Sequence, residues 1–159
     1  MYRSTSSIGN NVKCYWVENI LMKIKKEVII LEDINKVFKI INTVENYKNF
    51  VPYCNDSFIT ENSDGTIKGT LKFNLKGFDV TFTTNNSSKH NENINMVLNE
   101  GPFKNLEGSF DFKQIKDSTN INFTLDYSVT NPLIDTILDK SMQKIANILI
   151  EALINECKR

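Results

Sequence analysis

Alternation of apolar and polar residues predicts several β-strands along the chain. In residues 67–75 and 121–129 almost every second residue is apolar and the residues between them are polar. A period of two is typical of a strand with one buried face. Further strands are predicted at residues 78–82, 94–98, 110–112 and, near the start, Lys23–Leu31. Short turns join most of these strands, so consecutive strands should pair antiparallel.

Helical spacing of apolar residues predicts two short helices after the first strand and one long helix at the end. Asp33 suits the N-cap of the first helix, because its carboxylate can accept from free backbone N–H groups. Pro52 should end the second helix, since it disfavours helix before it. Residues 133–157 contain no Gly or Pro and carry an apolar stripe. The dipeptide Asn131-Pro132 suits the start of this long helix.

These elements predict one α+β domain over residues 22–159. Each strand has one apolar face that must be covered, and a sheet of this size must curl. We therefore expect a curved antiparallel sheet of about six to seven strands around the long C-terminal helix. A cavity between them would have the usual size of a ligand pocket, about 300–1,000 Å³.

Residues 1–21 are predicted to be a separate N-terminal tail. Met1–Val17 contains Arg3 and Lys13 but no acidic residue. This pattern faintly resembles a mitochondrial transit peptide. The alternatives are a disordered tail or a misassigned start, with Met22 opening the first strand of the domain.

Composition excludes several classes of function. The formal net charge of the 159 residues is zero, which argues against gripping DNA through bulk charge. The three cysteines Cys14, Cys54 and Cys157 show no CxxC spacing, so neither a disulfide framework nor a metal site is expected. No apolar run approaches the roughly 20 residues that a membrane span requires.

Residues suited to catalysis are few. The single histidine, His90, lies in a polar run and is interpreted as a solvated loop residue. Glu100 continues the inward parity of its strand and could orient a polar ligand group; alternatively, it meets solvent or Lys104. No GxSxG or HExxH motif is present. We therefore expect a protein that is not an enzyme and requires no cofactor.

Apolar residues on the inward faces are candidates for lining the cavity. Each would also serve in a filled core, where burial contributes roughly 1.5–3 kcal/mol without any ligand. The predicted lining residues are Leu71, Phe73, Phe82, Met96, Leu98, Phe110, Phe123, Leu125, Met142, Ile145 and Leu149. On the outer face of one strand, Lys68, Lys72 and Lys76 form a basic stripe that could meet RNA phosphates or anionic lipid headgroups, or could simply be a solvated face.

Two longer motifs resemble those of a known family. The first contains Tyr47, Phe50, Pro52 and Cys54. The second contains Gly101, Pro102, Phe103, Leu106 and Gly108, with Phe110 where many family members have Trp. These runs resemble the coenzyme Q-binding and ribosome-association toxin (RatA) family of the START-like superfamily, also described as polyketide cyclase/dehydrase and lipid transport.

The resemblance covers about residues 22–158 and implies a helix-grip fold with a hydrophobic ligand. The leading hypothesis is non-enzymatic binding of ubiquinone or a related isoprenoid lipid in support of respiration, with peripheral contact to a membrane. The alternative is a ribosome-association toxin that binds the large ribosomal subunit and blocks subunit joining. A cyclase or dehydrase is a weaker third reading. The expected location is the bacterial cytoplasm, with the mitochondrial matrix as the alternative.

Overall fold

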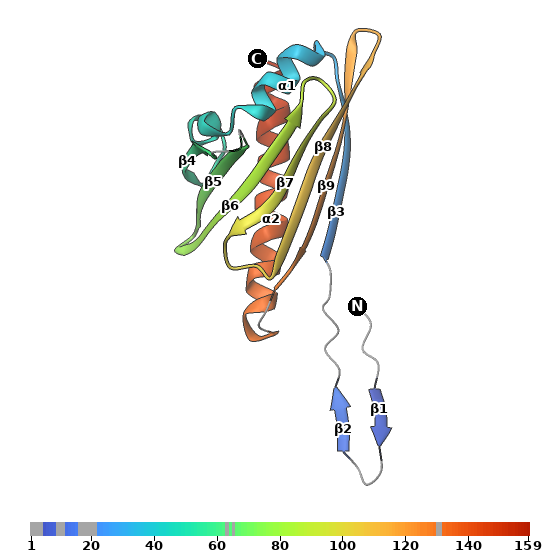
Figure 1. Cartoon of the computed structure of the whole chain (residues 1–159), viewed down its shortest axis with the longest axis vertical. Coiled ribbons are helices and arrows are strands. Elements are labelled where there is room, and N and C mark those ends of the chain that lie inside the picture. Colours follow the sequence, from blue (N-terminus) through green and yellow to red (C-terminus); the bar gives the residue numbers. More distant parts are fainter. Residues whose placement is uncertain (1–4, 9–11, 16–21, 63, 65, 130–131) are drawn as a thin grey trace.

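A seven-stranded antiparallel sheet forms the body of the protein (Figure 1). The computed structural model describes residues 5–8, 12–15, 22–62, 64, 66–129 and 132–159. The strands are β3 (Met22–Ile30), β4 (Cys54–Glu61), β5 (Ile67–Leu75), β6 (Phe78–Lys89), β7 (Asn93–Glu100), β8 (Asn105–Ile115) and β9 (Ser118–Ser128). Their order across the sheet is β3-β9-β8-β7-β6-β5-β4, so β3 and β4 are the two edge strands. The sheet confirms the predicted fold class.

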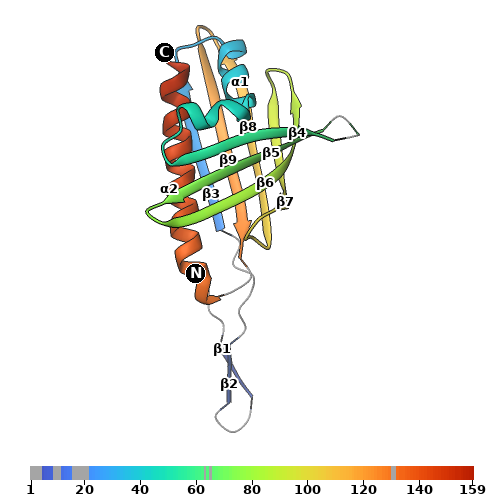
Figure 2. The ribbon, with the colours of Figure 1, turned by 90° about the vertical axis from the view of Figure 1, so that its left-hand side faces the viewer.

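Three helices complete the domain. Helix α1 (Ile34–Asn42) and the 3-10 helix η1 (Val44–Asn49) connect β3 to β4, and α2 (Pro132–Cys157) follows β9. Asp33 caps α1 as predicted, since its side chain accepts a hydrogen bond from the backbone N–H of Asn35 over 2.9 Å. Helix α2 runs along one face of the curved sheet (Figure 2).

The core lies between α2 and the sheet. Phe110, Phe123 and Leu125 point inward from β8 and β9 and are buried, as are Met142 and Ile145 of α2. These apolar side chains leave water on both partners, which is the main contribution to the stability of the fold. The apolar stripe predicted over residues 133–157 includes Ile137, and there the prediction was wrong, because Ile137 is 56% exposed.

Strand β4 was not predicted from the sequence. Its register with β5 shifts between Cys54 and Asp56, which marks a β-bulge. Beyond the bulge the residues still do not alternate, because the buried Ser57 is polar and the adjacent Phe58 and Ile59 are both exposed. Ser57 attaches β4 to η1, because its hydroxyl accepts from the Lys48 N–H over 3.0 Å and donates to the Glu45 carbonyl over 3.1 Å.

The described part of the N-terminal tail forms a separate two-stranded sheet. Strand β1 (Thr5–Ile8) pairs antiparallel with β2 (Val12–Tyr15). The rest of the predicted tail lies outside the described residues, as does the predicted cap Asn131, and a targeting role stays a prediction. Within the described ranges, no helix is long and apolar enough to cross a membrane.

Candidate functional site

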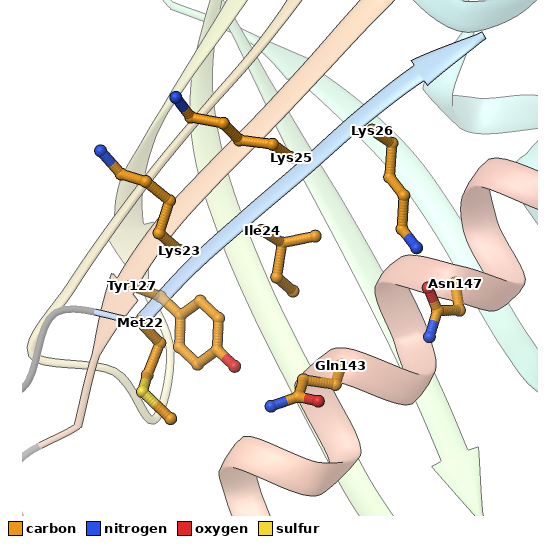
Figure 3. Close-up of a pocket in the computed structure, with 8 residues that line it drawn as sticks. All are labelled: Met22, Lys23, Ile24, Lys25, Lys26, Tyr127, Gln143 and Asn147. Carbon is orange, nitrogen blue, oxygen red and sulfur yellow. The ribbon is translucent and has the colours of Figure 1, made fainter. Parts of the chain in front are cut away.

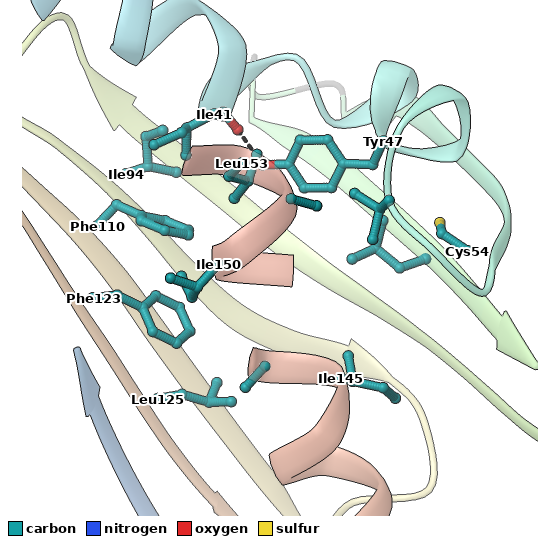
Figure 4. Packing of buried hydrophobic residues seen from close by; sticks show 14 of the residues in the cluster. Ile41, Tyr47, Cys54, Ile94, Phe110, Phe123, Leu125, Ile145, Ile150 and Leu153 are labelled. Carbon is teal, nitrogen blue, oxygen red and sulfur yellow. Dashed lines mark hydrogen bonds between the residues drawn. The ribbon is translucent and has the colours of Figure 1, made fainter. Parts of the chain in front are cut away.

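A small apolar cavity lies between α2 and the sheet, in the packing shown in Figure 4. Its walls come from β5 to β9, from the end of α1 and η1, and from α2. The volume is about 60 Å³, enough for a few water molecules. It is well below the roughly 300–1,000 Å³ expected for a ligand pocket, because large side chains such as Phe110, Phe123 and Met142 fill most of the space.

Most of the residues predicted to line the cavity do surround it. They are Leu71, Phe82, Met96, Phe110, Phe123, Leu125, Met142, Ile145 and Leu149. Phe73 and Leu98 do not belong to the lining. Phe73 is buried opposite Val80 and Cys54, nearer the β4 edge. Leu98 is half-buried near Gly101. That any of these residues contacts a ligand stays a prediction.

Sequence reasoning missed several other lining residues. They are Ile41, Asn42, Val44, Tyr47, Gly69, Thr84, Asn86, Ile94, Leu106 and Ala146. The inward parity of Ile94 with Met96 was visible in the sequence and could have identified it. Gly69 and Asn86 both line the cavity. A Cβ at Gly69 would stand 2.8 Å from Asn86 Nδ2, so the glycine leaves room for the Asn86 amide.

A few polar side chains lie among the apolar walls. The Thr84 hydroxyl donates to Asn86 Oδ1 over 2.7 Å. The Tyr47 hydroxyl donates to the Ile41 carbonyl, a contact drawn in Figure 4. Burial raises the pKa of Tyr47 far above its ordinary value. The phenol therefore stays neutral at physiological pH and serves as a structural donor.

The first family motif joins η1 to β4. Tyr47 is buried, and its ring packs edge-on against Phe50 with the centroids 5.8 Å apart. Cys54 is buried, and its thiol donates to the Asp56 carbonyl over 3.4 Å. Burial raises the pKa of Cys54, so the reactive thiolate is disfavoured. Pro52 is exposed and follows the end of η1.

The second family motif shapes the turn between β7 and β8. Gly101 has a φ of +154°, and a Cβ there would stand 2.9 Å from the Cβ of Phe82. Phe103 is buried between the rings of Phe82 and Tyr127, at centroid distances of 6.0 and 6.1 Å. Gly108 is buried where a Cβ would stand 2.8 Å from Met96 Cε. Leu106 is buried and lines the cavity, whereas Pro102 is exposed.

The residues considered for catalysis lie apart from the cavity. Glu100 is exposed at the end of β7, so of the two alternatives for this carboxylate the solvent-facing one holds. His90 is exposed and its ring meets Phe38 edge-on at a centroid distance of 5.2 Å. Among the described residues, no group of three or more His, Cys, Asp or Glu could hold a metal ion.

The predicted basic stripe is weaker than the sequence suggested. Lys72 Nζ lies 3.8 Å from Asp56 Oδ2 and 5.3 Å from the centroid of the Phe58 ring, so nearby groups already engage its charge. Lys76 lies beyond the end of β5, in a turn where its φ is +52°. Only Lys68 and Lys72 therefore share the outer face of the strand, and the prediction of a three-lysine stripe was wrong.

A family model described as polyketide cyclase/dehydrase and lipid transport matches residues 33–154. The chain belongs to this family. Membership confirms the resemblance carried by the Tyr47–Cys54 and Gly101–Gly108 motifs.

Two curated relatives of the chain come from Escherichia coli. The persistence and stress-resistance toxin PasT of strain CFT073 is 29% identical over 137 residues, covering 86% of this chain and 87% of that protein. The ribosome association toxin RatA of strain K12 is 28% identical with the same coverage.

A solved structure shows the same fold. The crystal structure of the Zhui aromatase/cyclase from Streptomyces sp. R1128 superposes with a TM-score of 0.77. The alignment covers 87% of this chain and 94% of that one at 15% identity. At this level of identity the similarity concerns the fold alone.

Proposed function

We propose that this protein is a non-enzymatic ribosome-associating regulator of translation that acts in the cytoplasm. The observation that carries the proposal is the match to ribosome association toxin RatA, which spans most of both chains. In this proposal the partner is the large ribosomal subunit, and the protein hinders its joining to the small subunit.

The properties of the protein interior favour a binding site on the outer surface. The cavity of about 60 Å³ admits no substrate of ordinary size without movement of the walls. The polar groups that could take part in chemistry are either buried and neutral or exposed. Burial raises the pKa values of Tyr47 and Cys54, and Glu100 and His90 face solvent. Exposed side chains are therefore the better candidates for contact with a partner.

Subunit joining provides a direct test of this function. Purified large and small subunits are mixed in magnesium-containing buffer, and their association is followed by light scattering with increasing amounts of protein. The proposal predicts a dose-dependent loss of joined ribosomes that reaches completion near stoichiometric amounts. Unchanged joining in the presence of excess folded protein would contradict it.

The apolar cavity supports a second candidate function, the binding of a hydrophobic ligand such as an isoprenoid quinone or another lipid. Phe82, Phe110 and Phe123 offer the ligand an apolar surface, and burial of an apolar tail gains roughly 25 cal/mol per Å². Such a tail needs far more room than 60 Å³, so α2 would have to move away from the sheet.

Mass spectrometry of gently purified protein tests the second candidate. A co-purifying quinone or lipid in near-stoichiometric amount, together with saturable binding of ubiquinone, is the expected result. Protein that is empty and also fails to bind ubiquinone in titration would eliminate this candidate and leave the ribosomal proposal unaffected.

A further inference from the structure

A second hollow lies on the outside of the domain, between the edge strand β3 and α2 (Figure 3). Its volume is about 340 Å³, several times that of the inner cavity. We call it the β3–α2 groove. Its lining residues are Met22, Lys23, Ile24, Lys25, Lys26, Tyr127, Gln143 and Asn147. Three lysines and two side-chain amides thus contribute to the lining, and no carboxylate is among the lining residues.

The position of Lys26 is unusual for a strand that packs on a core. Inward-facing residues of β3 alternate with outward-facing ones, and Ile24, Val28 and Ile30 share the parity of Lys26. An apolar residue would bury more surface at this place. The Lys26 side chain instead extends beside α2 toward Asn147 (Figure 3). Lys23 and Lys25 leave the strand on the other face, so the edge carries cations on both sides.

The carboxylates around the groove already have partners within the protein. Asp126 Oδ2 lies 3.8 Å from Lys23 Nζ. Asp139 Oδ1 accepts the hydrogen bond of the Tyr127 hydroxyl over 2.5 Å. Glu27 Oε1 accepts from an asparagine side chain of β9 over 2.9 Å. Asp139 and Glu27 keep their negative charge, because hydrogen bonds from neutral groups do not cancel it, but these contacts hold both carboxylates to partners within the protein.

The ammonium groups of Lys25 and Lys26 are available for an outside ligand. Within the part of the chain that the structure describes, neither lysine has a carboxylate within 4.0 Å. Lys140 is exposed two helical turns before Asn147 and extends the same side of α2. As an edge strand, β3 also presents backbone N–H groups that no neighbouring strand uses.

We propose that the β3–α2 groove binds the phosphodiester backbone of RNA, which in the context of the proposed function is ribosomal RNA. Lysine ammonium, amide N–H and backbone N–H groups are the donors that proteins use for phosphate oxygens. Lys23 and Lys26 are separated by about 10 Å along the strand and point to its two faces. This spacing suits an extended anion that crosses the edge of the sheet better than a single ion. The inference rests on ribosome association and specifies the face that contacts the ribosome.

An anionic membrane fits this groove less well than RNA. Peripheral membrane binding combines charge with an apolar face that enters the headgroup region. Met22 and Ile24, the two aliphatic side chains of the groove, are half-buried. The strongly exposed apolar residues of this region, Ile29 and Leu31, lie at the far end of β3 from Lys23.

Two paired substitutions of equal charge test the proposal. Lys25→Gln/Lys26→Gln removes two positive charges from the β3 edge that borders the groove, and Lys68→Gln/Lys72→Gln removes two from the outer face of β5. Both variants and the unaltered protein are titrated against purified large ribosomal subunits, deproteinised ribosomal RNA, and phosphatidylcholine vesicles with and without phosphatidylserine. Thermal unfolding confirms that each variant is folded.

The groove variant should bind large subunits and ribosomal RNA roughly 10-fold more weakly at 100 mM salt, with a salt slope lowered by about two. The β5 variant should stay within about 2-fold of the unaltered protein, because its charges lie outside the groove. Equal binding by the groove variant, or an equal loss in both variants, would overturn the proposal. So would a groove variant that loses only its binding to anionic vesicles.

The design separates failure of this inference from failure of the proposed function. If the unaltered protein binds large subunits and the Lys25/Lys26 substitutions do not change this binding, the groove proposal fails and ribosome association stands. If the protein binds free RNA through the groove but does not bind subunits, ribosome association fails and the groove proposal stands. If the protein binds neither free RNA nor large subunits, both proposals fail.

Discussion

The hydroxyl of Tyr127 donates a hydrogen bond to Asp139 Oδ1 over 2.5 Å and thereby ties β9 to α2. Tyr127 is fully buried in the sheet, and Asp139 is half-buried on α2. Gln143 adds a second donor, with its Nε2 atom 3.3 Å from both oxygens of Asp139. This contact sits beside the β3–α2 groove and attaches α2 to β9, the strand that pairs with β3.

Removal of the Tyr127 hydroxyl should weaken this attachment. Tyr127→Phe keeps the ring but leaves the Asp139 carboxylate without its strongest donor. We expect a loss of about 1–3 kcal/mol in the free energy of unfolding, measured by urea titration. Tyr53→Phe is the control, because the Tyr53 ring is 47% exposed, and it should change stability by less than about 0.5 kcal/mol. Equal effects of the two substitutions would show that the hydrogen bond contributes nothing.

Alkaline pH should destabilise the protein through Cys157. Burial raises the pKa of this thiol from 9.0 to about 11. Below pH 9 the thiol is protonated in both states, so it adds no pH dependence. Between pH 9 and 11 the unfolded chain loses the proton and the folded protein keeps it, so the stability falls as pH rises. Tyr127, whose pKa burial also raises, acts in the same direction at higher pH.

Cys157→Ala isolates the contribution of this thiol. The free energy of unfolding is measured at pH 8 and pH 10 for both proteins. We expect the decrease between the two pH values to be smaller in the variant. Equal decreases would mean that Cys157 titrates alike in the folded and unfolded states.

Alanine substitution at two glycines with positive φ measures the cost of backbone strain with and without a steric clash. Gly77, in the turn between β5 and β6, has a φ of +86° and nothing within 4 Å of an added Cβ. Gly77→Ala should therefore cost only the strain, about 1 kcal/mol. Gly101→Ala adds a clash 2.9 Å from the Cβ of Phe82, and should cost at least about 2 kcal/mol. Thermal unfolding of both variants provides the measurement, and equal costs would contradict the close approach of Gly101 to Phe82.

Truncation at the cavity wall should enlarge the cavity. Met142 is 3% exposed, and Met142→Ala should cost about 2–5 kcal/mol. An enlarged apolar cavity can bind benzene, so benzene should raise the melting temperature of the variant more than that of the unaltered protein. Ile137→Ala, at a position 56% exposed on the same helix, should be nearly neutral. A Met142→Ala protein of unchanged stability would show that this wall is loosely packed.

The regular parts of the fold could be predicted from the sequence because their side chains follow one period. Strand β9 alternates without interruption from Ile121 to Tyr127, and each inward residue is buried. Strand β4 escaped prediction because its residues do not alternate: the buried Ser57 is polar, and the adjacent Phe58 and Ile59 are both exposed. Periodicity reveals a strand only where apolar residues occupy the buried face and polar residues the other.

The candidate site was less predictable, because it depends on volumes and on charges brought together by folding. Alternation identified which residues point inward, but not that Phe110 and Met142 leave only about 60 Å³ between them. The three-lysine stripe failed because Lys76 lies in a turn. Lys26 carried a usable signal, since it interrupts the inward apolar row of β3. Its proximity to Asn147 depends on how α2 packs.

Ribosome association is the central claim, and sedimentation with isolated subunits tests it most directly. Purified protein is centrifuged through sucrose with separated large and small ribosomal subunits at 50 and 200 mM salt. The account predicts that the protein pellets with large subunits at low salt, not with small subunits, and that less pellets as salt rises. Protein that remains in the supernatant with large subunits at 50 mM salt would contradict the account.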